Sequence, residues 1–105
     1  MALARGVRSL HWTAHSKAKM RFYALSPARV RRILHSPARV EQGVAPDTVA
    51  YMQRAGNAKN PYELWTMVQD AGKLRKVISA WRYPGLTKPG EPLPPEIMRE
   101  LTELI

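Results

Sequence analysis

Apolar residues in the first forty positions recur with the spacing of short helices. The segment 15–24 predicts a first helix, with lysine and arginine on the faces left free by its apolar residues. Its side chains available for burial are Ala18, Met20 and Phe22. The segment 27–35 predicts a second helix, because Ser26 can cap it and Pro27 occupies the first helical position, where a missing N–H costs nothing. Its apolar stripe consists of Val30, Ile33 and Leu34.

The pentapeptide SPARV occurs twice, at 26–30 and at 36–40, yet the two copies are expected to adopt different structures. Their spacing is far below the period of a solenoid unit, so they do not indicate a repeat architecture. The first copy opens the second helix. The second copy ends it, because Pro37 disfavours the helical conformation at Ser36, and an extended run is expected from Arg39 onward.

Beyond Gly43 apolar and polar residues alternate, as they do in half-buried strands. Strands are predicted over 48–54, 62–69 and 74–81. The intervening segments are rich in turn formers, and Gly72 can take the positive φ that a hairpin between the last two strands requires. The chain is therefore expected to form an α+β domain. Two N-terminal helices would pack on a small three- to four-stranded antiparallel sheet, followed by a short C-terminal helix.

With 105 residues the chain is expected to form a single domain, 1–105, that folds without a stabilising cross-link. Residues 1–10 are predicted to be a loose basic arm or a short first strand that ends near Leu10 to Thr13. Residues 11–83 would form the core of the domain, and the segment 84–95, rich in proline and glycine, would run over its surface. Residues 96–105 are predicted to close the chain as a helix with leucine, isoleucine and methionine on one face.

The positive charge of the chain is concentrated in its first forty residues. This segment contains nine basic side chains and no acidic one, whereas the later lysines and arginines balance the eight aspartates and glutamates. The formal net charge of +9 therefore originates in one segment. Such a field attracts a polyanion, because each neutralised phosphate releases a condensed counterion, and nucleic acid is the leading partner. An acidic protein partner and a merely solvated basic face are the alternatives.

Cysteine is absent, which excludes disulfides, a thiolate nucleophile and zinc sites of the cysteine type. No apolar run reaches the length of a signal peptide or a membrane span, so a cytoplasmic location without a membrane partner is expected. His11, His15 and His35 do not indicate a metal site, because carboxylates are missing from the first forty residues. Since a glycine-rich phosphate loop is also missing, neither a metal nor another cofactor is predicted.

Several short motifs follow one another in the order typical of a known family. They are His15, Lys19 and Met20 at the first helix, Ser26 at the second, Pro37 and Glu41 beyond it, and Ile78, Ser79, Ala80 and Arg82 in the last strand. Together they resemble the small single-domain families related to the BrnT toxin, within the wider RelE/ParE-like group of ribonuclease toxins. The resemblance covers residues 11–83. Two positions depart from it, since relatives often have arginine in place of Tyr23, and Trp81 separates the Ser-Ala pair from its arginine.

The resemblance implies metal-independent cleavage of RNA by attack of the ribose 2′-OH on the adjacent phosphate. This reaction needs a base for the hydroxyl, a cation beside the phosphate and an acid for the leaving oxygen. We predict Glu41 or His15 as the base. Arg82 is expected to stabilise the phosphate together with Lys19, and Tyr83 to stack on a base or to donate the proton. The side chains predicted to hold the RNA are Lys17, Lys19, Arg21, Arg29, Arg31 and Arg32.

Each predicted catalytic residue also has a purely structural interpretation. His15 can bond backbone at a helix start, Arg82 can lie in water at a strand end, and Glu41 can pair with a neighbouring arginine. Two functions therefore remain open. One is a toxin-type endoribonuclease, and the other is a non-catalytic module of the same fold that binds nucleic acid or an acidic partner such as an antitoxin. The departure at Tyr23 slightly favours the module, whereas the presence of His15, Glu41 and Arg82 favours the enzyme.

Overall fold

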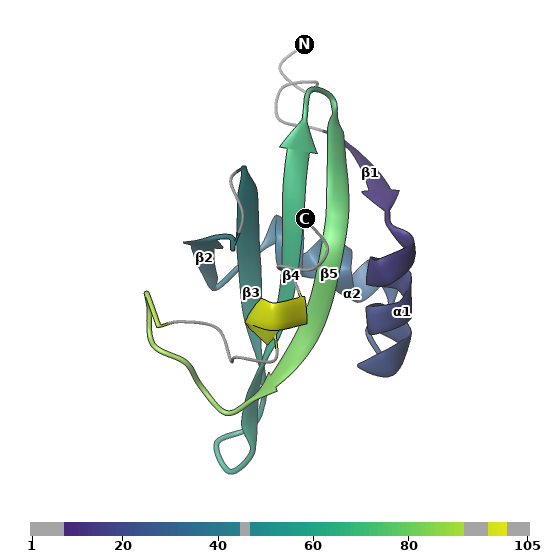
Figure 1. Ribbon diagram of the computed structural model, residues 1–105. Helices are drawn as coiled ribbons and strands as arrows, with labels where there is room; N and C mark the ends of the chain where they lie inside the picture. The colour runs from purple at the N-terminus through teal and green to yellow at the C-terminus, as the bar shows by residue number, and fades with distance from the viewer. Residues whose placement is uncertain (1–7, 45–46, 92–96, 101–105) are drawn as a thin grey trace.

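A short strand and two helices precede four consecutive strands (Figure 1). The structure, a computed structural model, describes residues 8–44, 47–91 and 97–100. The elements are β1 Ser9–Trp12, α1 Ala14–Phe22, α2 Pro27–His35, β2 Arg39–Gln42, β3 Thr48–Gly56, β4 Pro61–Ala71 and β5 Leu74–Pro84. Residues 97–100 form a further helical turn. The predicted basic arm up to residue 7, most of the predicted C-terminal helix and part of the proline-rich segment lie outside the described residues.

All five strands belong to one open sheet in the order β1-β5-β4-β3-β2. The strands β2 to β5 pair antiparallel with their neighbours in sequence, whereas β1 pairs parallel with β5, with Trp12 opposite Val77. The α+β class is confirmed, but the sheet is mixed and five-stranded instead of antiparallel with three to four strands. The two edge strands span four residues each, too short for alternation to define them, and their direction depends on where the helices return the chain.

Local signals explain where both helices begin. The Thr13 hydroxyl accepts a hydrogen bond from the Ser16 N–H at 3.1 Å, and the Ser26 hydroxyl accepts one from the Arg29 N–H at 3.0 Å. The predicted bounds of α2 are confirmed, and α1 lies within two residues of its prediction. The second SPARV copy ends α2 at the C-cap Ser36, as expected. None of the described helices is long and apolar enough to cross a membrane.

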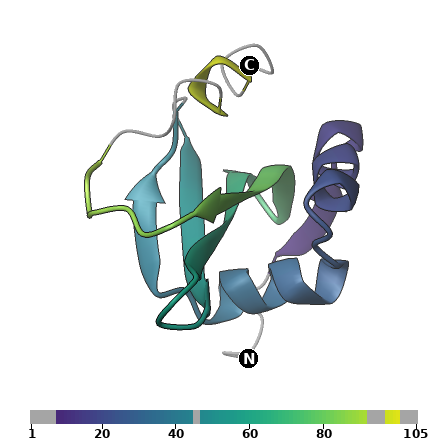
Figure 2. The ribbon, with the colours of Figure 1, turned by 90° about the horizontal axis from the view of Figure 1, so that it is seen from below.

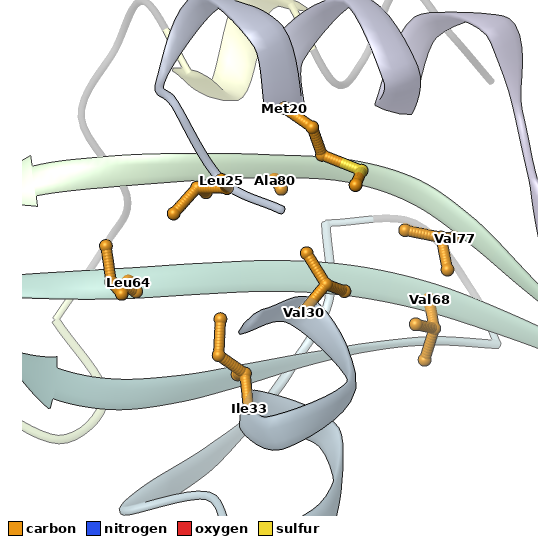
Figure 3. Packing of buried hydrophobic residues seen from close by; sticks show 8 residues of the cluster. All are labelled: Met20, Leu25, Val30, Ile33, Leu64, Val68, Val77 and Ala80. Atoms are coloured by element: carbon orange, nitrogen blue, oxygen red, sulfur yellow. The ribbon is translucent and has the colours of Figure 1, made fainter. Parts of the chain in front are cut away.

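One face of the sheet, here called the helix face, carries the core beneath α1 and α2 (Figures 2 and 3). Its buried cluster consists of Met20, Leu25, Val30, Ile33, Leu64, Val68, Val77 and Ala80. Phe22 does not join it, because its side chain is 74 % exposed. Two positions along a helix differ by about 200°, so Met20 and Phe22 cannot both face the sheet. The expected burial of Phe22 and Ala18 is therefore wrong.

The other face, here called the tryptophan face, is built around Trp65 and Trp81. Their rings stack across β4 and β5 with centroids 5.8 Å apart. The fully buried Glu63 accepts hydrogen bonds from the Trp65 indole at 2.9 Å and from the Thr87 hydroxyl at 2.8 Å. Arg39 donates to the Thr87 carbonyl at 2.9 Å. These bonds hold the segment after β5 on this face, and the helical turn 97–100 lies on the same side (Figure 2).

Candidate nucleic-acid interface

The two N-terminal helices form a layer with charge of one sign. Every charged side chain of α1 and α2 is basic. The lysines and arginines are Lys17, Lys19 and Arg21 on α1 and Arg29, Arg31 and Arg32 on α2, the six side chains that the sequence analysis assigns to RNA binding. The acidic side chains among the described residues lie in strands, loops and the turn 97–100. The helix layer therefore attracts anions over its whole outer surface.

A groove of about 560 Å³ lies beside the C-terminal half of α2. It is lined by Arg8, Leu10, Arg31, Arg32, Leu34, His35 and Arg75, and we call it the arginine groove. The basic lining comes from three parts of the chain, because α2 supplies Arg31 and Arg32, β5 supplies Arg75, and Arg8 directly precedes β1. In the described part of the chain, this lining contains no carboxylate.

Asp70 at the end of β4 orients two of the four arginines. Its carboxylate accepts two hydrogen bonds from Arg75, at 2.6 and 2.9 Å, and lies 3.4 Å from the Arg8 guanidinium. The bonds from Arg75 hold the pKa of Asp70 below its ordinary value, although burial opposes this shift. Asp70 therefore stays ionised at neutral pH. Since it neutralises only one of the two cations, the three side chains together keep a positive charge.

Arg31 and Arg32 keep their charge uncompensated. Neither forms a salt bridge within the described residues, where acidic partners are found for Arg8, Lys19, Arg39 and Arg75. The Arg31 guanidinium lies 5.4 Å from the centroid of the Trp12 ring, which orients it without neutralising it. A guanidinium has five N–H donors in a planar fork that matches phosphate oxygens. The arginine groove therefore combines two oriented cations with two uncompensated ones.

His15 and Lys19, predicted as base and phosphate partner, do come together. The His15 Nε2 atom lies 3.6 Å from one carboxylate oxygen of Glu100, and the Lys19 Nζ atom lies 2.7 Å from the other. Both side chains project from α1 toward the turn 97–100. Glu100 lies 81 positions after Lys19, and nothing in the sequence identified it as the partner.

Glu41 lies apart from this cluster, on the edge strand β2. Its carboxylate is 2.9 Å from the Arg39 Nε atom and accepts a hydrogen bond from the Gly90 N–H at 3.0 Å. This pairing with a neighbouring arginine corresponds to the structural interpretation of Glu41. Because β3 and β4 separate β2 from β5, Glu41 stands three strand spacings, about 14 Å, from the strand that carries Arg82.

Arg82 and Tyr83 are consecutive in β5 and therefore point to opposite faces of the sheet. Arg82 lies on the helix face, where it donates a hydrogen bond to the Tyr23 carbonyl at 3.0 Å. Tyr83 packs against the tryptophan cluster on the other face. The four predicted catalytic residues thus occupy four separate places, and His15, Glu41 and Arg82 do not converge.

Arg8, His35 and Arg75 are basic lining residues that the sequence analysis did not single out. Arg75 lies outside the basic segment, but strand alternation carried a usable signal, because Arg75 stands two positions before the buried Val77 and shares its face. Arg8 precedes the strand that pairs with β5. Its proximity to Asp70 depends on the parallel pairing of β1 with β5.

Comparison of the chain with protein-family models, with curated proteins and with solved structures gave no significant match. The features of the molecule that bear on function are the helix layer, the arginine groove and the separated polar clusters. Among these, the arginine groove concentrates uncompensated charge in a concave site.

Proposed function

We propose that the protein is a non-catalytic module that binds RNA through the helix layer and the arginine groove. The observation that carries this proposal is the position of Arg31 and Arg32, which have no acidic partner among the described residues and share a groove with two further arginines. Phosphate oxygens can accept hydrogen bonds from several of these guanidinium groups at once. The lysines and arginines elsewhere on α1 and α2 extend the positive field and steer a polyanion toward the groove.

The shape of the site favours nucleic acid over the two alternatives. A solvated basic face needs no groove, and its charges gain nothing from orientation by Asp70 or by the Trp12 ring. An acidic protein would present carboxylates that the same arginines could bind, but a nucleic-acid backbone supplies a phosphate anion at every nucleotide. A cluster of four arginines within one groove matches such a regular array of anions.

The separation of the predicted catalytic residues supports binding without turnover. A general base must lie within about 3 Å of the oxygen whose proton it removes, or act through one water molecule. A single ribose phosphate cannot meet this condition for Glu41 while it contacts Arg82, because three strand spacings lie between their strands. The pair of His15 and Lys19 at Glu100 is the one predicted site in which a base and a cation meet. Ribonuclease activity centred on this pair is the second candidate function.

A salt titration of RNA binding tests the main proposal. The affinity of the protein for a short RNA is expected to fall with rising salt, with a log-log slope of about 0.7 for each phosphate contacted on a single strand. Replacement of Arg31 and Arg32 by alanine should weaken binding about tenfold and reduce the slope by about 1.4. The matched control is the double variant Arg54→Ala/Lys88→Ala, which removes two exposed cations outside the helix layer.

Four outcomes would contradict the proposal. Binding that does not depend on salt, or no binding at low salt, removes the electrostatic basis of the interface. Equal weakening by the Arg31/Arg32 double variant and by its control shows that the groove has no special role. If polyglutamate of matched charge binds as tightly as RNA, the natural partner is an acidic protein. Cleavage of the RNA that is lost in His15→Ala would establish the second candidate instead.

A further inference from the structure

A second pocket, of about 600 Å³, lies at the opposite end of β4 and β5 from the arginine groove. We call it the tyrosine pocket. Its side chains with functional chemistry are Tyr23, Lys59, Asn60, Tyr62 and Arg82. They come from the end of α1, the loop between β3 and β4, and the ends of the two long strands that meet there (Figure 1). Like the arginine groove, the tyrosine pocket has no carboxylate among the described residues that line it.

Arg82 is held in a defined orientation within the tyrosine pocket. One of its terminal nitrogens donates to the Tyr23 carbonyl at 3.0 Å, and its guanidinium carbon lies 4.7 Å from the centroid of the Tyr62 ring. Neither contact neutralises its charge, and no salt bridge to Arg82 occurs within residues 8–44, 47–91 and 97–100. Since one hydrogen bond occupies one of five N–H donors, the guanidinium retains donors for an anion.

The Tyr62 ring that supports Arg82 lies close to the backbone at Gly56. Gly56 lies so close to this ring that a Cβ atom at position 56 would stand 2.9 Å from a ring carbon. Gly56 also has a φ of +81°, which favours glycine. The ring, the guanidinium and the Tyr23 carbonyl therefore form a preorganised group, and the Arg82 side chain does not have to be ordered when a ligand binds.

The chemistry of the tyrosine pocket matches one nucleotide. Aromatic rings and guanidinium planes stack on nucleobases, and the two cations of the pocket, Lys59 and Arg82, can bind a phosphate. Asn60 adds an amide that can both donate and accept hydrogen bonds at a base edge. Phe22, 74 % exposed, lies against Tyr23 with ring centroids 4.8 Å apart and adds an aromatic surface next to the pocket. In a duplex each base is stacked between its neighbours. Only an unpaired nucleotide therefore has a free base face that can stack in the pocket.

We infer that the tyrosine pocket binds an unpaired nucleotide of RNA, with its base stacked on the Arg82–Tyr62 group and its phosphate bound by Lys59 and Arg82. This inference rests on the proposed RNA binding and specifies its ligand as single-stranded RNA. The arginine groove and the tyrosine pocket lie at opposite ends of β4 and β5, so one strand can contact both along the helix face. Arg82 is then a binding residue, in contrast to its predicted role in catalysis.

The test compares single-stranded RNA with a duplex of the same sequence, using the full chain at one fixed low salt concentration. The wild-type protein is expected to bind the single strand more tightly. Arg82→Gln should weaken binding of the single strand about tenfold and leave the duplex nearly unaffected, since the loss of one stacked base has about this effect. The fluorescence of a 2-aminopurine base in the single strand should be quenched when the wild-type protein binds, and much less when Arg82→Gln binds.

Lys59→Ala tests the pocket with a substitution that is not expected to disturb folding, because Lys59 is exposed in the loop between β3 and β4. It should weaken binding of the single strand about threefold, as expected for one lost phosphate contact at low salt. The matched control is Lys88→Ala, which removes an exposed lysine outside the pocket and should weaken the single strand and the duplex equally and slightly. Thermal melting of each variant establishes that it is folded.

Failure of the inference and failure of the proposed function give different results. If Arg82→Gln and Lys59→Ala weaken single strand and duplex to the same extent, the tyrosine pocket is only part of the general positive field, and RNA binding itself stands. If the wild-type protein binds neither RNA at low salt, both ideas fall. If adenosine monophosphate binds but RNA does not, the pocket serves a free nucleotide and the inference about RNA is overturned.

Discussion

The two faces of the sheet use their charged residues in opposite ways. On the tryptophan face, Glu63 and Arg39 are tied into one network through Thr87, and Glu41 pairs with Arg39. On the helix face, Arg31, Arg32 and Arg82 have no acidic partner among the described residues, and aromatic rings or a backbone carbonyl orient two of them. These paired groups on the tryptophan face therefore stabilise the fold, whereas Arg31, Arg32 and Arg82 on the helix face remain available to a ligand.

The two faces also differ in the elements that supply their apolar contacts. The core of the helix face joins residues of α1 and α2, which are neighbours in sequence, to the strands (Figure 3). The tryptophan face joins Trp65, Trp81 and Ile97, which belong to two strands and the turn 97–100. The comparison implies that substitutions on the tryptophan face change stability, whereas substitutions of exposed cations on the helix face change binding.

The largest effect is expected from Trp65→Ala, which removes the centre of the tryptophan face. Loss of the buried ring should lower the free energy of unfolding by about 4 kcal/mol, because it leaves a cavity and ends the stacking on Trp81. Urea denaturation measures this change. Phe22→Ala is the matched control, since Phe22 is exposed and its loss should have little effect. Similar destabilisation by both variants would contradict the assignment of Trp65 to a core.

Glu63→Ala should have the next largest effect. Removal of the buried carboxylate leaves the Trp65 indole N–H and the Thr87 N–H without an acceptor, at a cost of about 3 kcal/mol. The loss of unfolding free energy should appear in urea denaturation, while the RNA affinity of the folded protein should not change. Glu91→Ala, which removes an exposed carboxylate, is the control for the change in net charge. Stronger RNA binding by both variants to the same extent would point to net charge alone.

Arg31→Ala and Arg39→Ala test the comparison most directly, since each removes one arginine. Arg39 donates two hydrogen bonds to Thr87 and lies over the Trp65 ring, so its loss should lower the free energy of unfolding by about 2 kcal/mol. Arg31→Ala should leave stability nearly unchanged and weaken RNA binding about threefold to fivefold. The reverse pattern, with Arg39 governing affinity and Arg31 governing stability, would show that the roles of the two faces have been exchanged.

The smallest effect is expected at Asp70, where a carboxylate compensates charge next to the arginine groove. Its pKa is lower in the folded protein than the ordinary 3.8, so ionised Asp70 stabilises the fold above that pH. This contribution is lost as the pH falls from about 4 through the pKa of the folded state. Unfolding measured against pH should show the loss in the wild type and not in Asp70→Asn.

The same variant should bind RNA about twofold more tightly at neutral pH, because Arg8 and Arg75 lose the anion that they share. Asp47→Asn, which removes an exposed carboxylate beyond β2, is the matched control. Equal gains in affinity for the two variants would contradict a local role of Asp70 in the arginine groove.

Local sequence signals were sufficient to predict the helices. The pair Ser26 and Pro27 defines the start of α2, and the Ser36-Pro37 pair defines its end, because capping and proline geometry act over one or two residues. Alternation located β3, β4 and β5 but placed several of their ends short, since a strand continues for as long as its neighbour offers hydrogen bonds. The strand β1 agrees with one of the two alternatives predicted for the N-terminal segment. Its parallel pairing with β5, 64 positions later, could not be derived from local pattern.

The candidate nucleic-acid interface was predictable only in part, because it combines residues that are close in sequence with residues that are far apart. The six cations assigned to RNA binding do lie on the two helices, since the charge bias is a property of the segment itself. The separation of His15, Glu41 and Arg82 became visible only with the sheet order, which places β2 and β5 three positions apart. Glu100 beside Lys19 and Asp70 beside Arg8 were equally inaccessible to sequence reasoning.

By itself, the sequence determined that positive charge dominates the first forty residues, that this segment forms two helices, and that strands follow. Those properties depend on composition and on contacts within one or two turns of chain. The tertiary structure alone decided which charges are neutralised and which stay free. Electrostatic pairing acts over a few ångströms of space whatever the separation along the chain, and strand register and helix packing determine which side chains come that close.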